Sequence, residues 1–250
     1  MTVVQALALL GTGIAGGLAS TVASIASVVS YPALLALGLP PLSANVTNTM
    51  SLVLTGAGSV LGSRPELTGQ RERVLRLCLV TGFGGAAGAA VLLLAPPAAF
   101  GLVVPVLIAG ASVLLLVQPR IRALSPRPGA ERSARRLAGV FCAAGYVGYF
   151  GAAGGVLMVA VLATMISEPL IRLNALKNAI LGAANAVASV IFAVFAPVHW
   201  LFVPPLAVGF LIGGYTGPRL VRRLPVSALR LLVALCGLAL AVKLGVSAYR

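Results

Sequence analysis

Two stretches of the sequence combine small residues with hydrogen-bond donors, a combination that suits the binding of a small anion. They contain Ser24, Ser27 and Ser30 in the first half of the chain, and Gly151, Gly154 and Gly155 in the second. Glycine lets the backbone approach a ligand closely, and a helix that begins there directs unpaired N–H groups toward it. Serine hydroxyls donate in the same way. The alternative is that these residues only allow helices to pack closely, as small residues do in membranes.

A cluster of polar residues follows each stretch. The clusters comprise Asn45, Thr47 and Asn48 in the first half, and Asn174, Lys177 and Asn178 in the second. Asn45 and Asn174 stand where a side chain caps a helix start, and capping is their simpler interpretation. Lys177 either attracts an anion at the cytoplasmic mouth or is a loop-edge charge that only obeys the positive-inside rule.

The deeper members of these clusters occupy matching positions in the two halves. Asn48 and Asn178 are 130 positions apart. Thr55 and Asn185, further along, are separated by the same interval. Because polar groups that face lipid are costly, the match favours a cavity-lining role for these residues, Asn48, Thr55, Asn178 and Asn185.

The sequence lacks the arrangements of acidic and metal-binding residues that many enzymes use. The acids are Glu66, Glu72, Glu131 and Glu168, all in or beside basic segments, and there is no aspartate. The sequence therefore offers no buried carboxylate for a cation site or a proton relay. It also contains no Walker A loop, HExxH or GxSxG motif, and its three cysteines are isolated. We expect no enzymatic activity, no metal and no cofactor.

The composition predicts the kind of fold that holds these residues. Of the 250 residues, 60% are hydrophobic and 9% charged, with a mean hydropathy of +1.07. Soluble domains carry about 25% charged residues, so the chain is predicted to be an all-α polytopic membrane protein in one domain. The net charge of +14 reports topology, not nucleic-acid binding, because the basic residues lie in short loops. The eight apolar runs are 2–38, 43–63, 74–95, 97–118, 136–166, 173–196, 200–218 and 226–248.

Two of these runs, 2–38 and 136–166, are longer than the ~17–25 residues that one crossing needs. Each is predicted to form a broken-helix hairpin, either re-entrant or a pair of full crossings. If both hairpins enter and leave on the same side, nearly all Lys and Arg residues fall on the cytoplasmic side, as the positive-inside rule requires. The halves, 1–118 and 137–250, are then inverted repeats of a hairpin plus three helices, joined by a basic linker, 119–136.

Several motifs resemble those of the TauE/SafE sulfite exporters, also called TSUP anion transporters. The resemblance rests on segments 31–41 and 44–49 in the first half, and on 148–155 and 174–178 in the second. The family often has a glycine cluster in the first hairpin as well, where this chain has Ala26 and Ser27. The resemblance covers both halves of the chain.

The resemblance implies export of sulfite, a sulfonate or another small anion across the inner (plasma) membrane by alternating access. The expected partners are the lipid bilayer and a small anionic substrate. Two alternatives stay open: a membrane scaffold that transports nothing, and a transporter of a neutral or cationic solute. The sequence also leaves open the exact anion, the coupling ion and whether the chain forms a homo-oligomer.

Overall fold

A computed structural model describes residues 1–122, 133–152, 154–221 and the positions 235, 238–239, 241–242 and 245–246. This part of the chain is helical and contains no strand. Its helices are α1 (Val3–Ala23), α2 (Ala26–Ala36), α3 (Pro41–Gly62), α4 (Arg64–Leu67), α5 (Arg71–Leu94), α6 (Pro97–Arg122), α7 (Ala134–Tyr149), α8 (Gly154–Ala163), α9 (Leu170–Phe195) and α10 (Val203–Val221). Most of the predicted linker, 119–136, and of the last apolar run, 226–248, lies outside the described residues.

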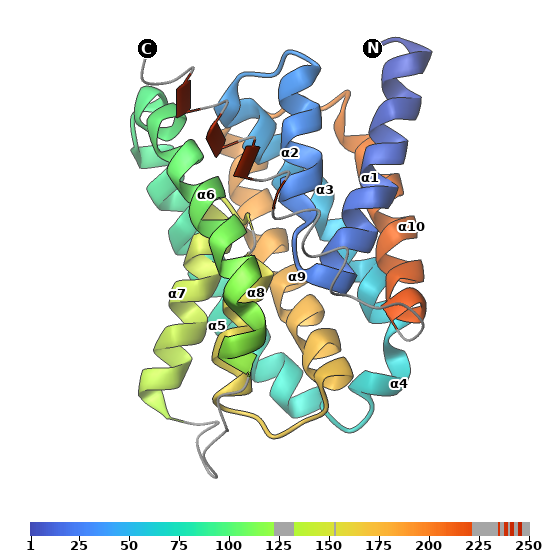
Figure 1. Ribbon diagram of the computed structural model, residues 1–250, viewed down its shortest axis with the longest axis vertical. Helices are drawn as coiled ribbons and strands as arrows, with labels where there is room; N and C mark the ends of the chain where they lie inside the picture. Colours follow the sequence, from blue (N-terminus) through green and yellow to red (C-terminus); the bar gives the residue numbers. More distant parts are fainter. Residues whose placement is uncertain are drawn as a thin grey trace.

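The two long apolar runs each fold into two helices that meet at a tight corner. α1 turns into α2 at Ser24, which has a left-handed φ of 66°, and α7 turns into α8 beside Gly151, with a φ of 74°. Glycine adopts such angles freely, whereas an L-residue there costs about 1–2 kcal/mol. In Figure 1 the α1–α2 hairpin enters from the upper end and turns back near the middle, and the α7–α8 hairpin does the same from the lower end.

The returning helices of both hairpins are too short to cross a membrane. α2 has 11 residues and α8 has 10, which at 1.5 Å per residue is about half of a ~30 Å hydrocarbon core. Among the described residues, three helices are long and apolar enough to cross: Val3–Thr21, Arg71–Leu94 and Leu170–Phe195. The first hairpin therefore pairs a helix long enough to cross, α1, with the half-length α2, and the second pairs the 16-residue α7 with the half-length α8.

α3 and α9 cross at the centre of the bundle. Each also packs against one further long helix, α10 beside α3 and α5 beside α9, and these in turn pack on α1 and α7. At the crossing, a β-carbon added to Gly56 would lie 2.6 Å from the Cα of Gly182. The backbones of α3 and α9 are thus in direct contact, which only glycine permits.

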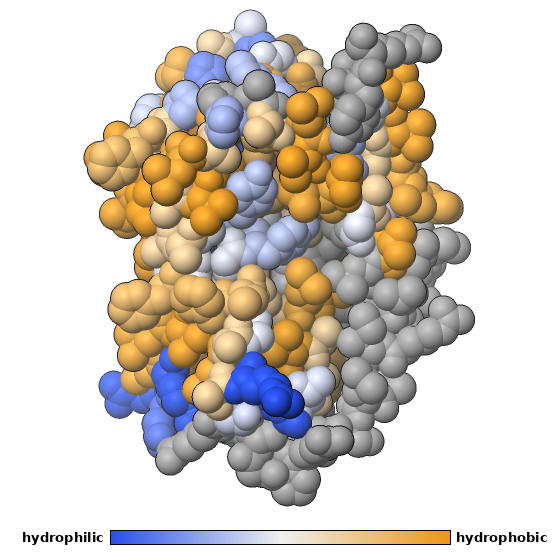
Figure 2. Space-filling model, turned by 90° about the vertical axis from the view of Figure 1, so that its left-hand side faces the viewer, coloured by the Kyte–Doolittle hydropathy of each residue, from blue (hydrophilic) through white to orange (hydrophobic). Residues whose placement is uncertain are grey.

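Apolar side chains cover the sides of the bundle, and charges gather at one end. Figure 2 shows orange side chains over much of one face and the strongly hydrophilic residues in blue at the lower end. Large residues such as Leu79, Phe83 and Phe195 are exposed. The described basic segments, on α4 and at the starts of α5, α7 and α9, all lie at the lower end in Figure 1. This distribution matches a bundle whose sides face lipid.

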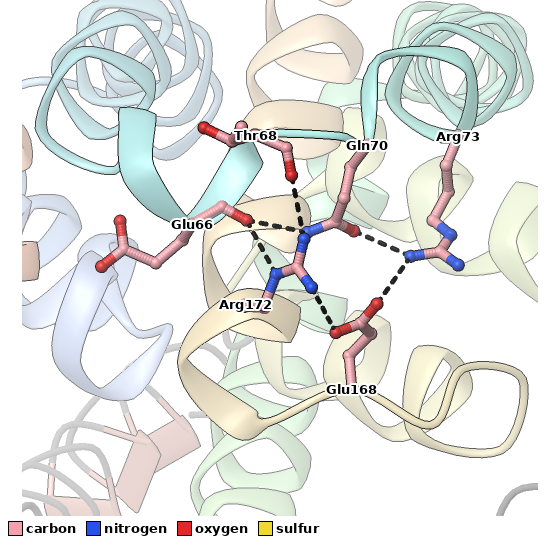
Figure 3. Close-up of polar contacts among 6 residues, drawn as sticks. All are labelled: Glu66, Thr68, Gln70, Arg73, Glu168 and Arg172. Atoms are coloured by element: carbon pink, nitrogen blue, oxygen red, sulfur yellow. Dashed lines mark hydrogen bonds and ion pairs between the residues drawn. The ribbon is translucent and has the colours of Figure 1, made fainter.

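At the charged end, a network of polar contacts ties the α4–α5 turn to the start of α9 (Figure 3). The Glu168 carboxylate lies 3.3 Å from Nη1 of Arg73 on α5 and 2.9 Å from Nη1 of Arg172 on α9. Arg172 also donates to the carbonyl oxygens of Glu66, at 3.2 Å, and Thr68, at 2.9 Å. One carboxylate and one guanidinium thus link segments about 100 residues apart.

We expect Glu168→Gln to loosen this end of the bundle, because two guanidinium groups lose a shared counter-charge. The free energy of unfolding should fall by about 1 kcal/mol, since the pairs are partly exposed to solvent. Thermal melts at low and at molar salt measure the effect, which should shrink as salt screens the charges. An equal loss of stability at both salt concentrations would contradict an electrostatic role.

Candidate functional site

A cavity of about 50 Å³ lies between the corners of the two hairpins and the α3–α9 crossing. It brings together eight of the residues that the sequence singled out: Ser24, Ser27, Thr55, Gly151, Gly155, Lys177, Asn178 and Asn185. A volume of this size has room for a small ion or a few waters. The lining comes from both halves of the chain, with α1 and α2 on one side and α7 and α8 on the other.

Lys177 brings a positive charge to the wall of this cavity. Its side chain is fully buried, and Nζ donates to the carbonyl oxygen of Ser20 at 3.2 Å and to Oγ of Ser24 at 2.7 Å. Both acceptors lie at the C-terminal end of α1, which carries the negative end of the helix dipole. The ammonium group is stabilised there while it faces the cavity, so Lys177 is not a charge at the edge of a loop.

The corners of the hairpins also present helix N-termini to the cavity. α2 begins at Ala26 and α8 at Gly154, and Ser27 and Gly155 of their first turns line the cavity. First-turn N–H groups have no partner within their own helix and favour anions. The corners touch, since a β-carbon on Gly155 would lie 2.6 Å from Cβ of Ser24. Two positive helix ends and an ammonium therefore converge on the cavity.

Asn45 and Asn174 do not line the cavity and do not cap their own helices, so the capping interpretation was wrong. Pro40 and Pro169 occupy the N-cap positions. Proline is well suited to a helix start, because its missing N–H costs no hydrogen bond there. As a result each helix begins before the asparagine, which lies inside it.

Each of these asparagines instead binds the end of a hairpin helix from the opposite half. Asn45 Nδ2 donates to the carbonyl oxygen of Tyr149 at 2.9 Å, at the end of α7. Asn174 Nδ2 donates to the carbonyl oxygen of Thr21 at 2.6 Å, near the end of α1. Both side chains satisfy carbonyl groups that a helix leaves unpaired at its C-terminus. They hold the hairpins in place beside the cavity.

Asn48 also lies outside the cavity lining, because its amide is bound by α2. Nδ2 donates to Oγ of Ser27 at 3.1 Å, and Oδ1 lies 2.6 Å from Oγ of Ser30, which donates to it. Of the remaining predicted residues, Thr47 accepts a hydrogen bond from the backbone N–H of His199 at 3.0 Å. Gly154 packs against the side chain of Val147. Ser30, Thr47, Asn48 and Gly154 thus lie outside the cavity lining, and their contacts hold neighbouring segments together.

We expect Asn48→Leu to destabilise the protein by about 1–3 kcal/mol, because it leaves the buried hydroxyl group of Ser27 without its partner. Ser30 Oγ can still donate to the carbonyl oxygen of Ala26 at 3.0 Å. Asn178→Leu should cost less, although the same residue type stands at the matching position, because no side chain of α8 binds that amide. Melting temperatures of the two variants in detergent test the difference. Equal losses of stability would show that the two asparagines are equivalent.

The cavity includes polar residues that the sequence analysis did not select. They are Ser20, Thr49 and Ser59. Two signals in the sequence point to members of this group. Ser20 precedes Ser24 by one helical turn and so shares its face, and Ser59 matches Ser189 at the 130-residue interval. Thr49 had no such signal.

No carboxylate lines the cavity within the described part of the chain. The described residues also contain no group of three or more His, Cys, Asp or Glu side chains that could hold a metal ion. The geometry is that of a small site that offers positive charge and hydrogen-bond donors, which is the chemistry of anion binding.

Comparison with known proteins agrees with this chemistry. A family model described as sulfite exporter TauE/SafE matches residues 9–244, nearly the whole chain. No curated protein and no solved structure gives a significant match. The match includes every helix that contributes to the cavity.

Proposed function

Because the chain belongs to the sulfite exporter TauE/SafE family, we propose that this multi-pass membrane transporter exports a small sulfur-containing or organic anion, such as sulfite or a sulfonate, through the cavity beside Lys177. The observation that carries the proposal is the buried ammonium group of Lys177 in a wall whose described residues include no carboxylate. Together with the N-terminal ends of α2 and α8, this charge favours an anion and repels a cation.

Two inverted repeats, 1–118 and 137–250, account for the way the helices pack. Exchanging α1 with α7, α3 with α9, and α10 with α5 turns each main helix contact into another main contact. The hairpins enter from opposite ends of the bundle (Figure 1). In inverted-repeat transporters, broken helices meet at the bilayer midplane, and movement of one repeat against the other opens the site to each side in turn. We assign this alternating-access mechanism to the single transporter domain.

The charged end of the bundle sets the orientation that we propose. Lys and Arg collect on the cytoplasmic side of inner-membrane proteins, which places α4 and the starts of α5, α7 and α9 in the cytoplasm. The negative interior of the cell then favours anion exit by about 2.3 kcal/mol per charge per 100 mV. Export along this potential needs no coupled proton or cation.

Thermal stability of the purified protein in detergent tests the proposal. Sulfite, sulfate, thiosulfate, sulfoacetate and simple carboxylates are compared, with chloride, a neutral sugar and an organic cation as references. A ligand at about 100 times its Kd stabilises the folded state by about 2.7 kcal/mol, which shifts the melting temperature measurably. We expect protection by one or more oxyanions, and flux of the same ions from proteoliposomes.

Failure of every anion to protect protein that melts cooperatively would overturn the proposal. Protection by the sugar or by an organic cation alone would identify a transporter of a neutral or cationic solute. Protection by nothing, without flux, would favour a membrane scaffold.

A further inference from the structure

The two matching asparagines of the repeats differ in what their amides bind. Asn48 uses both amide atoms on Ser27 and Ser30 of its own hairpin. The corresponding positions of the second hairpin, 128 residues later, are Gly155 and Met158, which carry no hydroxyl group. The amide of Asn178 therefore has no equivalent partners on α8.

The Nδ2 group of Asn178 is buried and has no hydrogen-bond partner. The side chain is 7% exposed and lines the cavity. Leaving a buried amide N–H without an acceptor costs about 1–3 kcal/mol. The group is therefore available to donate a hydrogen bond to whatever occupies the cavity.

The hydroxyl group of Thr55 also lacks a hydrogen-bond partner. It is buried without a partner, on a residue that is 4% exposed and lines the same cavity. Buried threonines elsewhere in the bundle do find acceptors: Thr81 Oγ1, for example, donates to the carbonyl oxygen of Ile180 at 2.8 Å. The unpartnered donors of Thr55 and Asn178 thus come from different halves of the chain.

The α3–α9 crossing places the two residues that carry these donors on neighbouring turns of two helices in contact. Thr55 directly precedes Gly56, and Asn178 precedes Gly182 by one helical turn. A β-carbon on Gly56 would lie 2.6 Å from Cα of Gly182 and 3.7 Å from the carbonyl oxygen of Asn178. The helices cannot separate the two side chains without breaking this contact.

We propose that Asn178 Nδ2 and Thr55 Oγ1 are the direct donors to the transported anion, one from each half, and that Asn48 only positions its hairpin. This inference rests on the proposed transport of an anion through the cavity. Lys177 adjoins Asn178 in the chain, but its ammonium group binds Ser20 and Ser24 and acts on the anion through its charge. The two donors, Thr55 and Asn178, favour an anion with at least two oxygen acceptors. The cavity volume of about 50 Å³ limits the size of that anion.

The test compares Thr55→Val with Thr81→Val, which removes a hydroxyl of equal burial outside the cavity. Thr55→Val should weaken sulfite binding about tenfold, by calorimetry or thermal shift, and leave the melting temperature of the ligand-free protein unchanged or higher. Thr81→Val should lower that melting temperature and leave the sulfite Kd unchanged. Asn178→Leu should weaken binding as Thr55→Val does. All variants are measured in the full-length protein.

The outcomes separate this inference from the proposed function. If the wild-type protein binds no anion, the proposed function falls and the inference falls with it. If the wild-type protein binds sulfite, and Thr55→Val and Asn178→Leu bind it equally well, the inference is wrong and the proposed function stands. A lower melting temperature in ligand-free Thr55→Val, with an unchanged Kd, would assign the hydroxyl a structural role and would also overturn the inference.

Discussion

Lys177→Met should reduce anion affinity about 10- to 150-fold, which corresponds to the loss of a charge–charge attraction of about 1.5–3 kcal/mol. Lys177 carries a buried cation in the cavity wall, and methionine fills a similar volume without charge. The folded state should survive, because methionine fills the space and the carbonyl oxygen of Ser20 keeps its hydrogen bond from the backbone N–H of Ser24. Calorimetric titration with the protecting anion measures the affinity, and anion efflux from proteoliposomes measures transport.

Arg219→Met is the matched control for this experiment. It removes a charge of the same sign from an exposed side chain at the lower end of α10, where the guanidinium stacks on Tyr215. The anion affinity of this variant should stay within about twofold of wild type, since solvent and salt screen exposed charges. If Lys177→Met binds the anion as tightly as Arg219→Met does, the cavity beside Lys177 is not the binding site.

Gly56→Ala should destabilise the protein by about 1–3 kcal/mol or more, because it overpacks the α3–α9 crossing. The added β-carbon would lie 2.6 Å from Cα of Gly182, and a backbone atom cannot rotate away as a side chain does. The helices must then move apart, which separates the cavity walls that they supply. Both the melting temperature and the anion affinity are therefore expected to fall.

Gly11→Ala provides the control, because a β-carbon at Gly11 of α1 would meet no atom within 4 Å. Alanine at an uncrowded helix position stabilises by up to about 1 kcal/mol relative to glycine. The two substitutions add the same methyl group, so their difference isolates the helix crossing. Equal melting temperatures for Gly56→Ala and Gly11→Ala would mean that α3 and α9 can move apart at their crossing without loss of stability.

The interruptions of the two long apolar runs were predictable from the sequence. Serine and glycine clusters mark the corners at Ser24 and Gly151, where the backbone adopts positive φ. The basic segments, the lack of buried acids and the family motifs likewise need no tertiary structure to be recognised. These features depend on the local backbone conformation or on the free energy of transferring a side chain between water and lipid. Both are properties of the individual residue type, whatever its position in the chain.

The partners of the polar side chains could not be predicted in this way. Asn48 and Asn178 match in residue type and position, yet one binds two serines and the other faces a cavity. Asn45 and Asn174 looked like local caps and instead bind carbonyl groups over 100 residues away.

A membrane protein of broken hairpins with donors and positive charge for a small anion could be recognised from residue types and their order alone. The donors that remain for a ligand, Thr55 and Asn178 among them, follow from the packing of the helices. This is because a buried donor binds whatever acceptor lies nearest, and in a helical bundle that acceptor often belongs to another helix.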